Sequence, residues 1–157
     1  MKIRPAAPRA FEAYCALVFE ADALHTKNAP RYYRPPGSPA RPRDYFDSLL
    51  QNPDRALFIA EMEGQIAGYV HLEARREPDI PILVPMDWVN VSDIVVAKRF
   101  QRQGVGHALL EHAKAWTKQR GAKDLRLSVA TFNEEAKDFY RKEGFQVKHE
   151  VMAFFLD

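Results

Sequence analysis

The spacing of hydrophobic residues predicts the elements of the first half of the chain. A helix is expected over about residues 9–24, because one helical track carries apolar side chains and one carboxylate. The track consists of Phe11, Cys15, Val18, Phe19 and Asp22. A short strand in IRPA precedes this helix, and a second helix over about residues 43–51 follows a proline-rich segment that cannot be regular. Residues 56–75 alternate as two strands that meet near Glu63–Gly64, which indicates a β-hairpin.

The strand that follows the next proline-rich loop changes phase part of the way along. Val89 and Val91 set one alternation, whereas Ile94 and Val96 follow the opposite one. One interpretation is a β-bulge near Ser92–Asp93. The other is a strand buried on both faces, which tolerates a continuous apolar run. Periodicity alone does not separate these two interpretations.

Two glycines one residue apart, Gly104 and Gly106, come between this strand and the next helical pattern. The elements expected after them are a helix that ends at Gly121, a strand over about residues 125–129, a helix capped by Asn133 and ended by Gly144, and one or two strand segments in Phe145–Leu156. This order of strands and helices predicts an α/β or α+β domain with a mixed sheet.

The composition is that of an ordinary globular domain. A chain of 157 residues is expected to form a single domain with one core. Its 23 Lys and Arg nearly balance its 21 Asp and Glu, so no nucleic-acid partner is expected. Cys15, the single cysteine, lies on an apolar stripe and is interpreted as a core residue. No apolar run is long enough to span a membrane, and no signal-peptide core follows Met1, so a cytoplasmic location is expected.

The glycine turn is the candidate site for chemistry. A strand that runs into such a turn and then a helix presents free amide groups at the positive end of the helix dipole, which suits a phosphate. The Walker loop is excluded, because the chain has no Gly-Lys-Ser/Thr tripeptide. The dinucleotide fingerprint is also excluded, since Leu109 stands where a third glycine or alanine is needed. What remains is the pattern Gln101-x-x-Gly104-x-Gly106 behind a strand with a phase change.

This pattern resembles the GCN5-related N-acetyltransferase (GNAT) family, which acylates amines from acetyl-coenzyme A. The family's companion motif, N-x-x-A-x-x-x-Y-x-x-x-G-F, is present as Asn133, Ala136, Tyr140, Gly144 and Phe145. The resemblance covers about residues 88–147 well, and the first 55 residues only as topology. It implies a mostly antiparallel central sheet that is splayed at a β-bulge and flanked by helices. It also implies one N-acetyltransferase domain over residues 1–157, made of acceptor-side helices and loop (1–56), a hairpin and loop (57–87), an acetyl-coenzyme A-binding core (88–147) and a C-terminal strand (148–157).

The resemblance implies acetyl-coenzyme A as the acetyl donor, bound at the glycine turn. No metal is expected, because His25, His107, His112 and His149 show no metal-ligand spacing with a cysteine or a carboxylate. The diphosphate would accept hydrogen bonds from the amides of residues 102–107, with Gly104 and Gly106 keeping side chains out of its path. The residues implied to hold the donor at the turn are Gln101, Arg102, Gln103, Gly104, Val105, Gly106 and His107.

The resemblance also assigns roles to the strand and to the last helix. Backbone groups of Ile94 and Val96 would pair with the pantetheine arm as a strand does, and Asn133 would contact the same arm. A backbone N–H near Val96 would stabilise the oxyanion that forms when the amine attacks the thioester. Tyr140 would point at the sulfur and protonate the departing thiolate.

The general base is the open part of this scheme. A free alkylamine has a pKa of about 10, so it must lose a proton before it attacks. Asp93 is the first candidate because it lies on the bulged strand, and Glu73 and His71 on the hairpin are alternatives, acting directly or through water. Each has a plain structural alternative: Asp93 would only be hydrogen-bonded at the bulge, and the other two would face solvent.

Three functions can be separated by experiment. The leading hypothesis is an acetyl-coenzyme A-dependent N-acetyltransferase that acts on a small-molecule or peptide amine. The alternative is a non-catalytic acyl-coenzyme A sensor, which has no turnover for Tyr140→Phe to lower. A nucleic-acid partner would use Arg31, Arg34, Arg41 and Arg43, and its affinity would fall steeply with salt. No membrane partner is expected, and dimers are frequent in the family, so a homodimer stays open.

Overall fold

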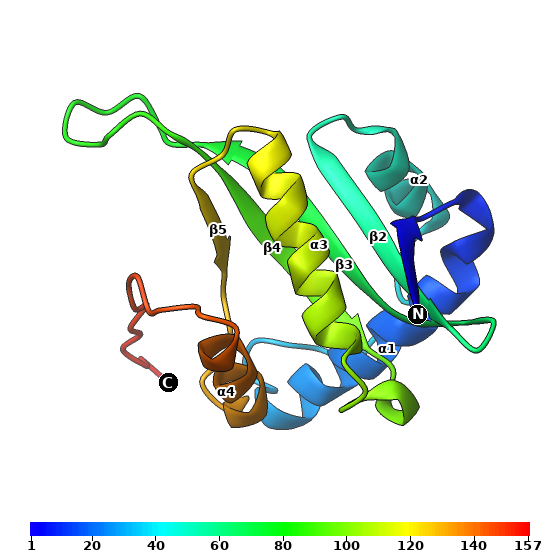
Figure 1. The fold of residues 1–157 in the computed structure, drawn as a ribbon. Coiled ribbons are helices and arrows are strands. Elements are labelled where there is room, and N and C mark those ends of the chain that lie inside the picture. Colours follow the sequence, from blue (N-terminus) through cyan, green and yellow to red (C-terminus); the bar gives the residue numbers. More distant parts are fainter.

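The structure, a computed structural model that describes residues 1–157, is a five-stranded sheet with helices on both faces (Figure 1). The strands follow one another across the sheet in chain order, and all neighbours are antiparallel except the last pair, which is parallel. They are β1 (Lys2–Pro5), β2 (Arg55–Met62), β3 (Gln65–Arg76), β4 (Asp87–Val96) and β5 (Asp124–Leu127). This arrangement confirms the predicted α/β class with a mostly antiparallel mixed sheet.

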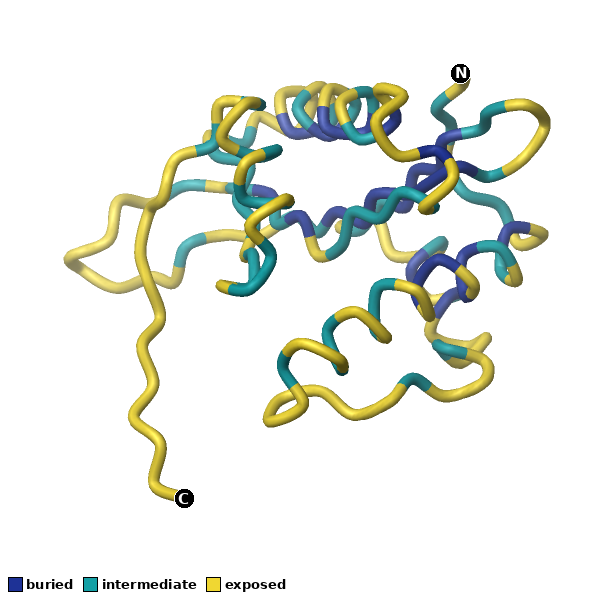
Figure 2. The backbone as a smooth tube through the Cα atoms, turned by 90° about the horizontal axis from the view of Figure 1, so that it is seen from below, coloured by how far each residue is buried: buried dark blue, intermediate teal, exposed yellow.

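Helices cover the two faces of the sheet unequally (Figures 1 and 2). They are α1 (Phe11–Asn28), α2 (Arg43–Gln51), α3 (Val105–Gln119) and α4 (Glu134–Lys142), with short 3₁₀ turns at Pro8–Ala10 and Lys98–Phe100. α1 and α2 pack on one face, and α3 packs on the other. α2 has the predicted bounds, whereas α1 begins two residues later than predicted and continues to Asn28. None of the helices combines the length and hydrophobicity needed to cross a bilayer.

The alternation along β3 divides the core into two clusters. Val70 and Leu72 point toward α3, while Tyr69 points toward α1 and α2. Cys15 is buried on α1, as expected for a core residue. The prediction for Phe19 is wrong, because its side chain is 47% exposed. The buried residues of α1 are Tyr14, Cys15, Leu17 and Val18, so the packed stripe lies to one side of the predicted track.

The phase change in β4 is a β-bulge. Leu72 of β3 pairs with Val91, and the preceding residue His71 pairs with Asp93, so Ser92 is the extra residue. This pairing confirms the bulge interpretation over a regular strand buried on both faces.

The strand expected in Phe145–Leu156, including the C-terminal strand assigned to residues 148–157, is not formed. α4 stops at Lys142, and Gly144 takes a φ of +90° just after it. The residues that follow are extended but belong to no sheet, and residues 146–157 are all exposed. An apolar sequence becomes a strand only when another strand supplies its hydrogen bonds, and within this chain none does so.

Candidate active site

The bulge turns Asp93 toward the α1 side of the sheet. Val91 packs in the cluster beneath α3, so uninterrupted alternation would have sent Asp93 to that same face. The extra residue Ser92 instead places it opposite His71, two positions from Tyr69 on the face that α1 covers. The negative charge of Asp93 contributes to the raised pKa of a group of phenols around it. These are Tyr14, Tyr45, Tyr69 and Tyr140.

Burial gives Asp93 and Tyr140 complementary acid–base properties. Desolvation raises the pKa of Asp93 from 3.8 to about 6, and the positive charge of Arg41 opposes only part of this rise. The carboxylate is therefore ionised at neutral pH and is a stronger base than an ordinary aspartate. Burial, followed by the charge of Asp93, raises the pKa of Tyr140 to about 12, so its phenol keeps its proton. Asp93 forms no salt bridge, which leaves its carboxylate available.

The second half of α1 supplies a wall of this site that the sequence analysis did not assign. Asp22 binds the guanidinium of Arg41 through two hydrogen bonds of 2.6 and 3.2 Å. The ring of His25 lies 5.0 Å from that of Tyr33 and 5.5 Å from that of Phe132, measured between centroids. The charges of Arg41, Asp22 and His25 all act on the pKa of Asp93. The available signal was Asp22 itself, a carboxylate on an otherwise apolar helical track.

The two alternative bases on β3 lie in different surroundings from those expected. His71 is only 2% exposed, and burial lowers the pKa of its ring to about 4, so it is neutral. Neither ring nitrogen has a hydrogen-bond partner. The carboxylate of Glu73 accepts contacts from Arg55, at 3.1 Å, and from Arg75. The alternative expectation that His71 simply faces solvent is wrong, because its side chain is buried. Glu73 is tied to arginines, which favours Asp93 as the base.

The glycine turn presents the amide groups that a bound anion needs. Arg102 and Gly104 have positive φ angles of 62° and 82°, and Gly104 forms the N-cap of α3. The first α-helical bond is donated by Ala108 to the carbonyl of Gly104, at 3.0 Å. The amides of residues 102–107 therefore precede the helical ladder and lie at the positive end of the dipole. These features fit a diphosphate.

Glycine is needed at the two positions of the turn for different physical reasons. A side chain on Gly104 would meet no atom within 4 Å, so this position requires glycine for its positive φ. A Cβ on Gly106 would lie 3.0 Å from the ring of Phe139, so glycine here allows α4 to pack against α3. These reasons add to the expectation that the two glycines keep side chains out of the path of the diphosphate, which stays a prediction.

β4 and β5 separate beyond the bulge. β5 pairs with β4 only along Trp88–Val91, and β4 continues to Val96 with no strand on that side. Ile94 and Val96 therefore lie beside an open edge, as the resemblance implies, although the carbonyl of Val96 also accepts a hydrogen bond of 3.3 Å from the Gln101 amide. The Asn133 side chain, expected to contact the pantetheine arm, accepts a hydrogen bond from the amide of Ala136 at the start of α4.

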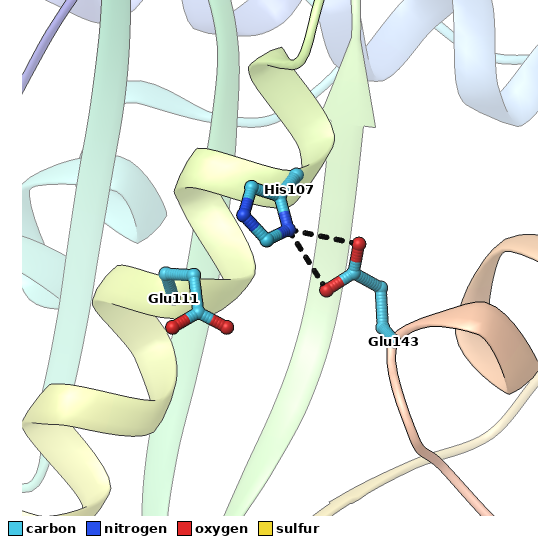
Figure 3. Close-up of side chains that lie close together, drawn as sticks. All are labelled: His107, Glu111 and Glu143. Carbon is cyan, nitrogen blue, oxygen red and sulfur yellow. Dashed lines mark hydrogen bonds and ion pairs between the residues drawn. The ribbon is translucent and has the colours of Figure 1, made fainter.

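An ion-pair cluster ties the first turn of α3 to the end of α4 (Figure 3). The Nδ1 atom of His107 lies 2.9 and 3.0 Å from the carboxylate oxygens of Glu143. The ammonium of Lys114 lies 2.7 Å from Glu111 and 3.6 Å from Glu143. Lys114 thus supplies the positive charge that the two carboxylates need. The cluster holds the helix of Tyr140 against the glycine turn.

The open sheet edge, the amides of the turn and the half-buried pair of Asp93 and Tyr140 are features that fit an acyltransferase fold. Comparison with known proteins agrees: the sequence profile of the acetyltransferase (GNAT) family matches residues 22–145, so the chain belongs to this family. The family resemblance is thereby confirmed.

Individual relatives and solved structures are consistent with this assignment. An uncharacterized N-acetyltransferase of Methanocaldococcus jannaschii is 28% identical over 71% of this chain and 48% of its own length. An N-alpha-acetyltransferase of Sulfurisphaera tokodaii is 28% identical over 74% of this chain and 71% of its own. The chain therefore spans about half the length of the first relative. A mutant of the Bacillus halodurans protein BH1408 has a crystal structure with a TM-score of 0.95, 23% identity and 99% coverage of both chains.

Proposed function

We propose that this chain transfers an acetyl group from acetyl-coenzyme A to a primary amine of a small molecule or peptide, by direct attack of the amine. The observation that carries the proposal is the pairing of Asp93 and Tyr140. The pKa of the carboxylate is raised to about 6, and its charge, after burial, helps to raise the pKa of the phenol to about 12. Direct attack of an ammonium substrate on a thioester is assisted by one group of each kind, a base for the amine and an acid for the departing thiolate.

The donor would be held by the glycine turn and the open edge of β4. The amides of residues 102–107 would donate hydrogen bonds to the diphosphate, and the side chains of Arg102 and Gln103 flank it. Arg102 is bound to Glu135 of α4 at 2.8 Å, but 81% of its side chain is exposed, so it can turn toward a phosphate. The backbone of Ile94 and Val96 would guide the pantetheine arm toward Tyr140.

Proton movements at two residues complete the reaction. Asp93 accepts a proton from the bound ammonium, which frees the nitrogen lone pair for attack on the thioester carbonyl. Tyr140 donates its phenolic proton to the departing sulfur, so the thiol leaves neutral. The nitrogen then gives up its second proton, which restores the phenol of Tyr140 and leaves the neutral amide, and Asp93 releases its proton to solvent. Positioning both substrates where β4 and β5 separate contributes more to the rate than either proton transfer alone.

The acceptor side favours a positively charged amine. Asp93 is the carboxylate of this site without an ion pair, while Asp22 is matched by Arg41. Phenol rings surround it, and rings of this kind attract an ammonium group. A cytoplasmic location is part of the proposal, because a chain with one buried cysteine draws no benefit from an oxidising compartment.

Thiol release from acetyl-coenzyme A tests the proposal, with polyamines, aminoglycosides, amino acids and peptide N-termini as acceptors. We expect Tyr140→Phe to lower kcat by about 100-fold, within the range for a lost general acid, while donor affinity measured by calorimetry stays the same. Tyr32→Phe is the matched control, since Tyr32 is 61% exposed. Donor binding without thiol release on any acceptor would favour the sensor alternative, and no binding at millimolar donor would refute both.

A further inference from the structure

α4 is held in place without a fully buried side chain. None of its nine residues is buried, although α1, α2 and α3 each bury at least two. This helix nevertheless carries Tyr140, and a general acid must lie within hydrogen-bond reach of the atom that it protonates. Polar contacts with the neighbouring elements therefore take a large share in placing the acid.

One side of α4 and its C-cap faces the glycine turn and the first turn of α3. Three residues spaced by four positions form this side: Glu135, Phe139 and Glu143. The carboxylate of Glu135 lies 2.8 Å from the guanidinium of Arg102, and the ring of Phe139 packs against Gly106. The carboxylate oxygens of Glu143 lie 2.9 and 3.0 Å from Nδ1 of His107 (Figure 3). The segment expected to bind the diphosphate thus also contacts the helix of the acid along its length.

The two polar contacts are expected to respond differently to donor binding. The side chains of Arg102 and Glu135 are 81% and 67% exposed, so water screens their attraction, and Arg102 can turn toward a phosphate. The Glu143 side chain is only 13% exposed, and Lys114 also contacts it. The ammonium of Lys114 lies 3.6 Å from the carboxylate and donates a hydrogen bond of 3.3 Å to the backbone carbonyl of Glu143. His107 is expected to bind the diphosphate through its amide, which leaves its ring in contact with Glu143.

We propose that Glu143, held by His107 and Lys114 of α3, is the positioning residue of Tyr140. Glu143 follows Tyr140 within one helical turn, and its amide donates a hydrogen bond of 3.0 Å to the carbonyl of Phe139, so a displacement of Glu143 also moves the phenol. The inference rests on the proposed function, in which Tyr140 protonates the thiolate. It adds that losing the contacts of Glu143 slows this step without weakening donor binding, because the amides of the turn lie outside α4.

The kinetics of two Glu143 variants measure this role. We expect Glu143→Ala to lower kcat for thiol release by about tenfold or more, and Glu143→Gln, whose amide oxygen still accepts a hydrogen bond, to lower it less. The dissociation constant of acetyl-coenzyme A, measured by calorimetry, should stay within about twofold of the wild-type value. Glu135→Gln, which removes the other ion pair on the same side of α4, is the matched control and should leave kcat within about twofold. An unchanged kcat in Glu143→Ala, or an equal loss in Glu135→Gln, would refute the proposal.

The Tyr140→Phe background shows whether Glu143 acts through the phenol. With no phenolic proton left to position, Glu143→Ala should lower kcat by no more than about twofold in that background. A general structural role would give the same loss with and without the phenol, and that result would refute the positioning role. The variants are expected to fold, because Glu143 is not a buried residue and α4 contributes none to the core.

Fluorine NMR of the free protein labelled with 3-fluorotyrosine tests the placement of Tyr140 without turnover. The chain has six tyrosines, and the line that disappears in Tyr140→Phe is that of Tyr140. We expect this line to shift or broaden in Glu143→Ala but not in Glu135→Gln. An unchanged line in Glu143→Ala would overturn the proposal. If the expected pattern is present but no acceptor supports thiol release, the proposed function fails while the placement of Tyr140 by Glu143 stands.

Discussion

Asp93→Asn should stabilise the protein at neutral pH while it removes activity. Burial raises the pKa of Asp93 from 3.8 to about 6, so ionising this group costs folding free energy. Since one pKa unit is worth about 1.4 kcal/mol, the cost is about 3 kcal/mol once the carboxylate is fully ionised. The native state holds its proton more tightly than the unfolded chain does. The contribution of Asp93 to stability is therefore most favourable below about pH 4 and becomes less favourable as the pH rises from about 4 to about 6.

Urea unfolding of the wild type and of Asp93→Asn at several pH values measures this cost. We expect the difference in unfolding free energy to move by about 2.4 kcal/mol in favour of the variant between pH 4 and pH 7.5, because the unfolded carboxyl is already partly ionised at pH 4. In the wild type, kcat/KM should rise with pH around a midpoint near 6, and the variant should lose about 100-fold in kcat/KM or more.

Asp87→Asn is the matched control, because Asp87 lies on the same strand with its side chain 55% exposed. Its effect should stay within about 0.5 kcal/mol at every pH, as for other surface substitutions. If the Asp93 variant shows the same stability difference at pH 4 and at pH 7.5, the carboxylate is not desolvated and the assignment of Asp93 as the base fails.

Three further substitutions test other parts of the structure. Gly104→Ala should lower stability by about 1 kcal/mol and weaken acetyl-coenzyme A binding in calorimetry, because φ is +82° there; an unchanged affinity would speak against the turn as the donor site. Asn133→Ala removes the N-cap of α4 and should lower the unfolding free energy in urea by about 1 kcal/mol. A much smaller loss would show that the Asn133 side chain does not accept the hydrogen bond from the Ala136 amide. Leu109→Ala should cost about 2–5 kcal/mol, since this side chain is fully buried, whereas Phe19→Ala should cost far less; similar losses would contradict the described core.

The sequence was sufficient to predict those elements whose bounds are set by residues close to them in the chain. Pro42 occupies the N-cap of α2 and Asn52–Pro53 follows its last turn, so its length could be predicted from the sequence. The hairpin turn at Glu63–Gly64 has two positive φ angles, which the glycine at its second position favours. The bulge at Ser92 appeared as a change of phase, because burial fixes which side chains of β4 face each cluster.

Features that depend on distant partners could not be predicted in the same way. The pair of Asp22 and Arg41 acts on Asp93 because α1 crosses the sheet beside β4, about 70 positions away in the sequence. The apolar pattern of Phe145–Leu156 predicts a strand, but a strand forms only where its backbone pairs with a neighbour, and this segment pairs with no strand of the sheet. The reason for glycine at position 106 could not be predicted either, because it depends on the ring of Phe139, which belongs to another helix.

The extra residue at Ser92 makes the two sides of the sheet independent of each other. Before it, β4 places Val89 and Val91 in the interior under α3; after it, the same strand directs a carboxylate to the opposite side. Residues on the α1 side can therefore be substituted without disturbing the interior beneath α3. Residues beneath α3 can likewise be substituted without moving the carboxylate of Asp93. If the proposed amine acceptor binds on the α1 side, a fold with this offset can change its acceptor by substitutions on that side alone.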